Sequence, residues 1–260
     1  MGKDILENKR VAIIGFGNMG QAIAKGLLHH RVTLPEHIIT TKSNKENTYA
    51  VTNAHVVILC VKPHIMTAVL NKIKCLNMTD KLIISVAAGI SIDTIEKYLG
   101  KRAKIVRVMP NLCARAGESM SCWVKNKQIT LSDVNIIKSL LKSFGKEIEM
   151  RCENDLNKAT AVSGSGPAYF FYFVEAFVES ARRLGLNNEM SKLLVMQTIK
   201  GSLITLTRSA KSVEESRKQV TSKGGTTEAA LKILTDDKFK EVFYKATHAA
   251  YNRSLELNFS

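Results

Sequence analysis

The sequence predicts an α/β protein: a doubly wound, mostly parallel sheet in residues 1–152, followed by an all-helical half in residues 153–260. Three observations predict this division. Short, continuously apolar runs alternate with helical segments in the first half, as buried parallel strands and their crossover helices do. A glycine-rich turn follows the first of these runs. After about residue 152, the long apolar patterns all have helical spacing.

Strands of the first half are expected at five apolar runs, VAIIGFG, HIITT, VVILCV, LIISVAA and KIVRVMP. The first crossover helix is NMGQAIAKGLLHH, with apolar residues at helical spacing from Met19 to Leu28. A short helix begins after Ser91, which can cap it, and ends at Gly100. ESMSCWVK and KEIEM, on either side of the helix-like SDVNIIKSLLKSFG, are expected to complete the sheet.

The second half is expected to be a set of long helices. AYFFYFVEAFVESARRLG follows Pro167 and ends at Gly185, and a further helix covers about 189–209. Ser212 opens a capping box with Glu215, and the last two helices are TTEAALKIL and KFKEVFYKATHAAYNRSLEL. The helix that ends at Gly185 is apolar around much of its circumference, which predicts an intertwined homodimer.

The stretch AVSGSGPAYFF, residues 161–171, could hold a nucleophile, a phosphate or only a break between helices. A nucleophile elbow needs a glycine two residues before its serine and a strand leading into it, and Ser165 has neither. We therefore expect a helix break, with Ser165 as the cap and with Gly164 and Gly166 allowing close approach.

Composition excludes several classes of protein. The formal charge is +15, but the lysines are dispersed along the chain and aromatic residues are few, which favours a solvated surface attracting small anions over nucleic-acid binding. Five cysteines without a CxxC pair predict reduced thiols, a cytoplasmic location and no metal site, and the six histidines do not cluster. No stretch approaches the ~20 apolar residues that span a bilayer, so we expect no membrane association.

GFGNMG is a G-x-G-x-x-G pattern formed by Gly15, Gly17 and Gly20, in the required context between a strand and a helix. Gly15 permits a tight turn, Gly17 lets the backbone approach a pyrophosphate, and Gly20 lets the helix pack on the strand. The phosphates would meet the free amides of the helix N-terminus. The pattern predicts a Rossmann-like dinucleotide site, with a purely structural turn as the alternative.

The segment TTKSNKEN after the second strand bears on the choice of cofactor. An enzyme that prefers NAD places an acid here, but the first carboxylate, Glu46, comes late. Thr41, Lys42, Ser43 and Lys45 offer hydroxyls and positive charge to a 2′-phosphate. We therefore predict NADP, with NADPH preferred and NADH possible. A solvated basic turn is the alternative.

Three further turns follow strands of the predicted sheet: VKP at residues 61–63, AAGI at 87–90, and MPN, which ends at Asn111. An open α/β sheet binds its ligand at the carboxyl ends of its strands. The small residues Ala87, Ala88 and Gly89 would let a flat nicotinamide approach the backbone. Each turn taken alone could be ordinary turn chemistry.

The motifs GFGNMG, CVKPH, SVAAGIS, RVMPN, SGSGPAY and TSKGGTTEAAL occur in an order and spacing that resemble those of pyrroline-5-carboxylate reductases. The resemblance covers nearly the whole chain; SGSGPAY followed by GGTT is its specific part. It implies reduction of the cyclic imine pyrroline-5-carboxylate to L-proline with NADPH or NADH. It also implies an N-terminal Rossmann domain, a helical dimerisation domain, active sites between the cofactor domain and the dimer helices, and assembly of dimers into larger rings such as a decamer.

The resemblance also implies roles for residues by position. Ser222 to Thr227 would bind the substrate carboxylate, with free amides at Gly225, Thr226 and Thr227, and the Thr227 hydroxyl would bond the ring nitrogen. The substrate-binding set is Ser222, Gly224, Gly225, Thr226 and Thr227. The cofactor set, joined with the residues inferred above, is Ile14, Gly15, Phe16, Gly17, Asn18, Met19, Thr41, Lys42, Ser43, Asn47, Cys60, Val61, Lys62, Pro63, Val86, Ala87, Ala88 and Asn111.

The chain departs from the family pattern at two places. Lys223 stands where SPGGT has proline, and the segment between Thr41 and Asn47 is too short for the usual second helix and third strand. One alternative function is an NADP-dependent β-hydroxyacid dehydrogenase or other imine reductase, for which Lys158 would be the lysine of the helical domain. Another is a non-enzymatic NADP-sensing or nucleic-acid-binding protein. The alternative role for Thr227 is a plain helix cap.

Overall fold

The computed structural model describes residue 6 and residues 9–257. It divides into two units, one formed by residues 1–167 together with 249–260 and the other by residues 168–248. The last helix, α11 (Phe239–Leu257), therefore begins in the second unit and ends in the first. The domain boundary between residues 152 and 153 stays a prediction.

The first unit contains a seven-stranded sheet with the order β2-β1-β3-β4-β5-β6-β7. Its strands are β1 (Val11–Ile14), β2 (Ile38–Thr41), β3 (Val56–Leu59), β4 (Leu82–Ser85), β5 (Lys104–Met109), β6 (Ser119–Lys125) and β7 (Gly145–Glu149). The pairs are parallel except for β5 and β6, which are antiparallel. All seven expected strands are present, and the carboxyl ends of β1 to β5 therefore share one edge of the sheet.

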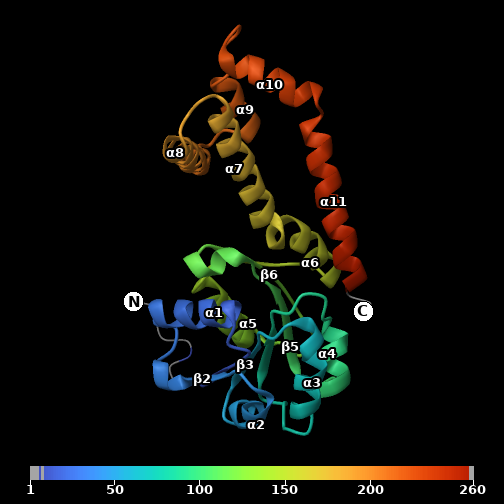
Figure 1. Cartoon of the computed structure of the whole chain (residues 1–260). Helices are drawn as coiled ribbons and strands as arrows, with labels where there is room; N and C mark the ends of the chain where they lie inside the picture. The colour runs from blue at the N-terminus through green and yellow to red at the C-terminus, as the bar shows by residue number, and fades with distance from the viewer. Residues whose placement is uncertain (1–5, 7–8, 258–260) are drawn as a thin grey trace. The chain divides into compact units, whose positions relative to one another are not determined.

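Helices cover both faces of this sheet (Figure 1). Side chains of α1 (Asn18–His29) and α5 (Leu131–Lys142) pack on one face. Side chains of α2 (Asn44–Thr52), α3 (Pro63–Ile73) and α4 (Ile92–Leu99) pack on the other. The four residues of β1 are at most 1% exposed and alternate between the two cores, which explains why the run VAII is apolar throughout. The doubly wound fold is confirmed.

The helix α2 corrects the expectation that this part of the chain is too short for a second helix. Nine residues from Asn44 to Thr52 are helical, and β3 follows at Val56. Ala50 and Val51 are fully buried in the core and hold this short helix on the sheet. Packing of these two side chains compensates for the weak helix propensity of a segment rich in Asn and Thr.

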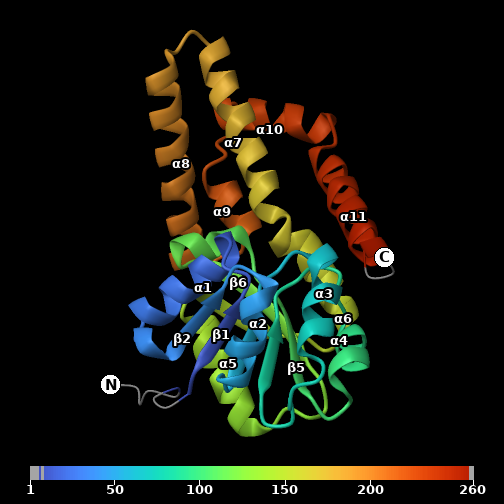
Figure 2. The ribbon, with the colours of Figure 1, turned by 60° about the horizontal axis from the view of Figure 1, so that its bottom comes forward.

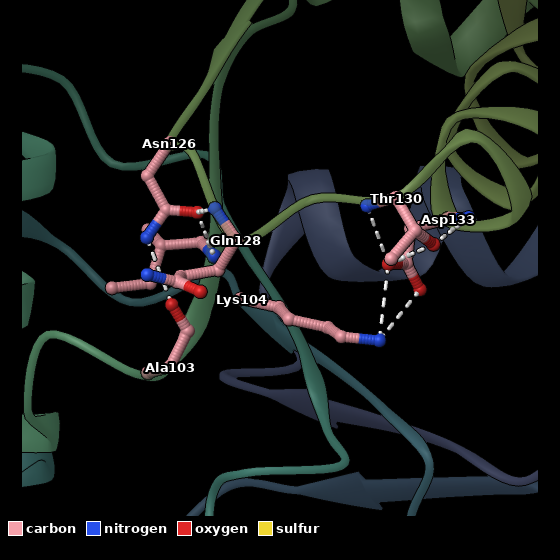
Figure 3. Close-up of polar contacts among 7 residues, drawn as sticks. Ala103, Lys104, Asn126, Gln128, Thr130 and Asp133 are labelled. Atoms are coloured by element: carbon pink, nitrogen blue, oxygen red, sulfur yellow. Dashed lines mark hydrogen bonds and ion pairs between the residues drawn. The ribbon is translucent and has the colours of Figure 1, made fainter.

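Polar side chains fasten the start of β5 to the end of β6 and to α5 (Figure 3). The side chain of Asn126 donates to the Ala103 carbonyl at 2.8 Å and accepts from the Ile105 amide at 3.2 Å. Lys104 Nζ lies 3.1 Å from a carboxylate oxygen of Asp133. Thr130 and Asp133 form a capping box that opens α5. These contacts fix the edge of the sheet opposite the carboxyl ends of β1 to β5.

From residue 153 onward, the secondary structure of the described chain is helical. In the first half, Pro35–His37 and Leu112–Ala116 form short 3-10 turns. The helices of the second half are α6 (Glu153–Ala159), α7 (Gly166–Arg183), α8 (Asn188–Arg208), α9 (Val213–Gln219), α10 (Thr226–Asp236) and α11. α7 and α8 form a helical hairpin (Figure 2). Gly185, with φ +97°, ends α7 as expected, and Ser212 and Glu215 form the expected capping box.

The stretch AVSGSGP separates α6 from α7 as expected, but not through the expected cap at Ser165. Residues Thr160–Gly164 form a π-helical turn, and the amide of Ser165 donates to the Thr160 carbonyl at 2.8 Å. Ser165 keeps a right-handed helical conformation and does not cap α7. The turn allows the close contact expected at Gly164, where an added Cβ would lie 2.6 Å from Met109 Cε, but around Gly166 such an atom would meet open space.

Candidate active site

The glycine-rich turn after β1 is built by close backbone contacts. Gly15 has φ +93°, and its amide and that of Phe16 each donate to the Thr41 carbonyl at 3.1 Å. A Cβ at Gly15 would lie 2.8 Å from Val61 Cγ1, and one at Gly20 would lie 2.4 Å from the Gly15 carbonyl oxygen. Only glycine fits at either position. The structure thus gives Gly15 and Gly20 the steric roles expected from the sequence.

The N-terminus of α1 is open. Gly17 is the N-cap residue, no side chain caps the helix, and the first turn carries no acidic residue. A Cβ added to Gly17 would meet no atom within 4 Å. Uncapped amides at the positive end of a helix beside an open space form an anion-binding site. The residues present therefore fit the pyrophosphate of a dinucleotide, with Asn18 and Met19 as the first helical residues.

The segment after β2 separates into a buried pair and an exposed basic stretch. The Thr41 hydroxyl donates to Asn47 Oδ1 at 2.7 Å, and both residues are only 2% exposed. The Thr41 and Asn47 side chains therefore hold α2 against the end of β2, and their direct contact with a cofactor stays a prediction. Lys42, Ser43 and Lys45 are exposed at the start of α2, and their contact with a 2′-phosphate stays a prediction.

The turns after β3 and β4 lie at the same edge as Gly15. The Cys60 amide donates to the Ile14 carbonyl at 2.8 Å, and the Val86 amide donates to the Leu59 carbonyl at 3.1 Å. Val61, Lys62 and Pro63 lead from β3 into α3, and Ala87 and Ala88 follow Val86. Burial raises the pKa of the Cys60 thiol to about 12, so it stays protonated and is not a nucleophile.

The turn after β4 also contacts the C-terminal end of α11, which sequence reasoning missed. Gly89 has φ +73°, and a Cβ there would lie 2.7 Å from the Leu257 carbonyl oxygen. The end of α11 is fastened beside α6, where the Tyr251 hydroxyl donates to Asn154 Oδ1 at 3.0 Å. Hydrophobic periodicity cannot reveal a contact between residues as distant in sequence as Gly89 and Leu257. Gly89, which follows Ala87 and Ala88, was the only sign in the sequence that another part of the backbone comes close.

Asn111 is occupied by contacts within the protein. Its Nδ2 lies 3.2 Å from both the carbonyl oxygen and Oγ of Ser163, and its Oδ1 accepts from the Cys113 amide at 3.1 Å. These bonds attach the end of β5 to the π-helical turn before α7. Asn111 therefore positions the edge of the sheet, and a direct bond to cofactor stays a prediction. Ser163 was not foreseen as a site residue.

The predicted substrate loop lies in the second unit, at the N-terminus of α10. Ser222 to Gly225 form a tight turn in which Gly224 has φ +74° and the Gly225 amide donates to the Ser222 carbonyl at 3.1 Å. The Gly225 amide is therefore not free, which corrects the expectation. The Gly224 amide donates to a Glu228 carboxylate oxygen at 2.7 Å.

Two amides of this loop remain available for an anion. In the described part of the chain, the amides of Thr226 and Thr227 have no hydrogen-bond partner, and no side chain caps α10. The N-cap residue is Gly225, so Thr227 is not the cap of this helix. The Thr227 hydroxyl makes no bond with a described residue. It can therefore bond a ligand without giving up a structural contact.

Comparison with known proteins decides the family. The chain is 35% identical over 266 residues to pyrroline-5-carboxylate reductase 2 of Bacillus subtilis, covering 96% of this chain and 95% of the relative. The chain belongs to the pyrroline-5-carboxylate reductase family. A family model for pyrroline-5-carboxylate reductase dimerisation matches residues 153–257, and one described as coenzyme F420-dependent NADP oxidoreductase matches residues 10–50 and 43–89.

Solved pyrroline-5-carboxylate reductases have the same fold. The Plasmodium falciparum pyrroline carboxylate reductase, crystallised with NADP bound, superimposes with a TM-score of 0.88 at 32% identity, covering 97% of this chain and 99% of that one. The reductase from Coxiella burnetii gives 0.87 at 35% identity, covering 96% and 99%. The similarity extends over both units, so it does not depend on the dinucleotide motif alone.

The alternatives from the sequence find little support at this site. Lys158, considered for a β-hydroxyacid dehydrogenase, is exposed and lies 2.9 Å from Asp155 Oδ1, whose hydrogen bond and charge raise the lysine pKa.

Within residues 9–257, no three side chains of His, Cys, Asp or Glu gather as a metal site would require. Over the same residues, no helix is long and apolar enough to cross a membrane.

Proposed function

We propose that this protein reduces pyrroline-5-carboxylate to L-proline with NADPH, the last step of proline biosynthesis. The observation that carries this conclusion is the similarity to pyrroline-5-carboxylate reductases over at least 95% of both chains. The open N-terminus of α1 supports a dinucleotide, and the basic residues Lys42 and Lys45 support NADPH over NADH.

The residues of the sheet edge bind and orient the cofactor. Amides at the start of α1 bind the pyrophosphate, while Lys42 and Ser43 bind the 2′-phosphate. Ala87 and Ala88 leave room for the nicotinamide beside the backbone. The bound cofactor supplies a hydride for the imine carbon, while a proton completes the amine at nitrogen. Because a protonated imine is already electrophilic, geometry and charge placement account for most of what the protein contributes.

The loop at the start of α10 binds the substrate. The free amides of Thr226 and Thr227 face the substrate carboxylate at the positive end of the helix. The Thr227 hydroxyl hydrogen-bonds the ring nitrogen and keeps the nitrogen protonated or bonded while the carbon is reduced. Ser222, Gly224 and Gly225 shape the turn so that the two amides are available.

The protein forms a homo-oligomer through its helical part. The match to a dimerisation family model covers residues 153–257, and α7 exposes a run of aromatic side chains. Phe170, Phe171, Tyr172 and Phe173 are 45% to 74% exposed. We propose a homodimer as the unit and a ring of dimers, such as a decamer, as the larger form, located in the cytoplasm. Sedimentation equilibrium distinguishes these sizes.

The function is tested by the rate of NADPH oxidation with pyrroline-5-carboxylate as substrate. The reaction should be rapid with the imine and at least tenfold less efficient with NADH. The same assay run with NADP and β-hydroxyacids tests the alternative dehydrogenase, for which no signal is expected. Oxidation with hydroxyacids and silence with the imine would overturn the proposal. Cofactor binding without any turnover would favour an NADP sensor.

A further inference from the structure

A groove lined by positive charge runs along α5 in the first unit. It has a volume of about 630 Å³, within the ~300–1,000 Å³ range of small-molecule sites. Lys138 and Lys142 of α5 form one wall, and Lys9 and His30 form the other. Among the described residues, no Asp or Glu lines it.

The groove is separate from the cofactor site and from the dimerisation segment. Lys9 lies two residues before β1 and His30 is the C-cap of α1, so both lie at the edge of the sheet opposite the turn at Gly15. All lining residues fall between positions 9 and 143, outside the matched segment 153–257. A ligand here would contact neither the pyrophosphate site nor the helices that mediate dimerisation.

Among the described residues, Lys138 of this groove has no acidic partner and Lys142 has only a distant one, unlike other helical lysines. Lys97 lies 2.9 Å from Asp93, and Lys218 lies 2.9 Å from Glu214, each one helical turn apart. Lys138 and Lys142 are also one turn apart, but they carry the same charge, which destabilises a helix. Lys142 forms a long ion pair, 3.9 Å, with Glu147 Oε1, while Glu147 Oε2 accepts a hydrogen bond from the Trp123 indole.

Polar and apolar groups complete the groove. Ser132, Asn135 and Ser139 lie on the same stripe of α5 as Lys142 and offer hydroxyl and amide donors. Ile136 and Val32 provide an apolar patch between the charged walls. Several ammonium groups with neighbouring neutral donors are suited to a linear chain of phosphates, whose spaced negative charges would relieve the repulsion between the lysines.

We propose that this groove is a second anion site, which binds a polyphosphate group, either as free polyphosphate or as part of a nucleotide. The test is calorimetric titration of tripolyphosphate into the full-length protein saturated with NADP, so that the cofactor site is already occupied. One site per chain is expected, with affinity that falls as salt increases. Absence of binding under these conditions would overturn the proposal.

The variants K138Q/K142Q and K72Q/K74Q distinguish a built site from diffuse charge. The second pair removes the same charge from exposed positions at the end of α3, on the other face of the sheet. At least tenfold weaker binding is expected for K138Q/K142Q and less than a twofold change for K72Q/K74Q. Equal weakening in the two variants would contradict a specific site. K9Q, on the opposite wall, should weaken binding severalfold without disturbing α5.

Adenosine triphosphate without magnesium, titrated in parallel, distinguishes the two sources of the polyphosphate. A nucleotide ligand should bind more tightly than tripolyphosphate, because its base can cover Ile136 and Val32. Free polyphosphate as the natural ligand predicts the reverse order. In either case the affinity should be lost in K138Q/K142Q.

Discussion

Asn111 and Ser163, 52 positions apart in the sequence, are joined by hydrogen bonds of 3.2 Å from Asn111 Nδ2 to both oxygens of the serine. Ser163 in turn donates its hydroxyl to the Met120 carbonyl at 3.3 Å. The pair connects the end of β5 with a π-helical turn, a feature often found at functional sites. The start of α7 is thereby fixed to the edge of the sheet that carries the predicted cofactor residues.

Asn111→Ala should destabilise the protein by about 2–3 kcal/mol, because it removes the two contacts to Ser163 and the cap on the Cys113 amide. Ser163→Ala loses less and should cost about 1 kcal/mol. Urea unfolding of both single variants and the double variant measures this. The double variant should cost clearly less than the sum of the singles; strict additivity would show that the two residues do not act together.

Gly17→Ala and Gly15→Ala separate binding from folding. An added methyl at Gly17 meets open space, so stability should change by less than about 0.5 kcal/mol, while NADPH binding weakens at least tenfold, roughly 1.4 kcal/mol. Gly15→Ala should destabilise the fold by about 1–3 kcal/mol, because φ is +93° and the space is filled. Thermal unfolding and fluorescence titration measure both. Unchanged NADPH affinity in Gly17→Ala would place the pyrophosphate elsewhere.

Lys42→Gln should raise the KM for NADPH about five- to tenfold and leave that for NADH within twofold, because Lys42 is exposed beside the expected 2′-phosphate position. Lys25→Gln, which removes the same charge from the exposed side of α1, serves as the control. Equal effects on both cofactors would show that Lys42 contributes general positive charge and does not select NADPH.

Asp133 should give the protein part of its acid sensitivity. Burial alone would raise the pKa of this carboxyl, but hydrogen bonds from Thr130 and the charge of Lys104 outweigh it and hold the pKa below 3.8. The ionised Asp133 therefore stabilises the fold fully above about pH 3.9, the pKa of an Asp in the unfolded chain. This stabilisation is lost as the pH falls through the lower pKa of the folded state.

Asp133→Asn should cost about 1–2 kcal/mol at neutral pH and flatten the loss of stability below about pH 4. Asp93→Asn is the control, because Asp93 and Lys97 are each 70% exposed and their pair should contribute less than about 0.5 kcal/mol. Unfolding free energies measured between pH 7 and pH 2 make the comparison. An unaltered acid limb in Asp133→Asn would show that other carboxyls govern it.

Thr227→Ala should lower kcat by roughly one to two orders of magnitude, the range typical of lost proton-handling groups, and leave stability and the KM for NADPH unchanged. The hydroxyl has no structural partner among the described residues, so loss of activity cannot be attributed to unfolding. Thr227→Ser should retain most of the rate. Steady-state kinetics with an intact kcat in Thr227→Ala would remove the residue from the mechanism.

The strands and the glycine-rich turn were predictable because their signals are local. VAII is apolar throughout because both of its faces are buried, and Gly15 and Gly20 follow from backbone contacts that exclude any side chain. The helix α2 was missed because its few apolar residues give almost no periodicity. Only tertiary packing on the sheet makes that segment helical.

Other features depend on contacts that a sequence does not display. SGSGP is typical of a break, but the π-helical form of this break was not predictable, because it depends on contacts of Ser163 and Gly164 with β6 and β5. The expectation that the Gly225 amide is free was wrong, because this amide donates to the Ser222 carbonyl and closes the turn. The hydroxyl of Thr41 was expected at the cofactor, and the structure shows it bonded to Asn47. Ser163, Gly225 and Thr41 each have a polar group that could bind a ligand, but in the structure that group is hydrogen-bonded within the protein.

The most direct test of the central claim is deuterium transfer from NADPH that carries deuterium at both hydrogen positions of nicotinamide C4. Incubation with pyrroline-5-carboxylate should give L-proline that carries one deuterium on the carbon that was the imine carbon, seen by mass spectrometry and NMR, and Gly17→Ala should slow its formation. Proline without deuterium, or no proline while NADPH is consumed, would contradict hydride transfer to the cyclic imine.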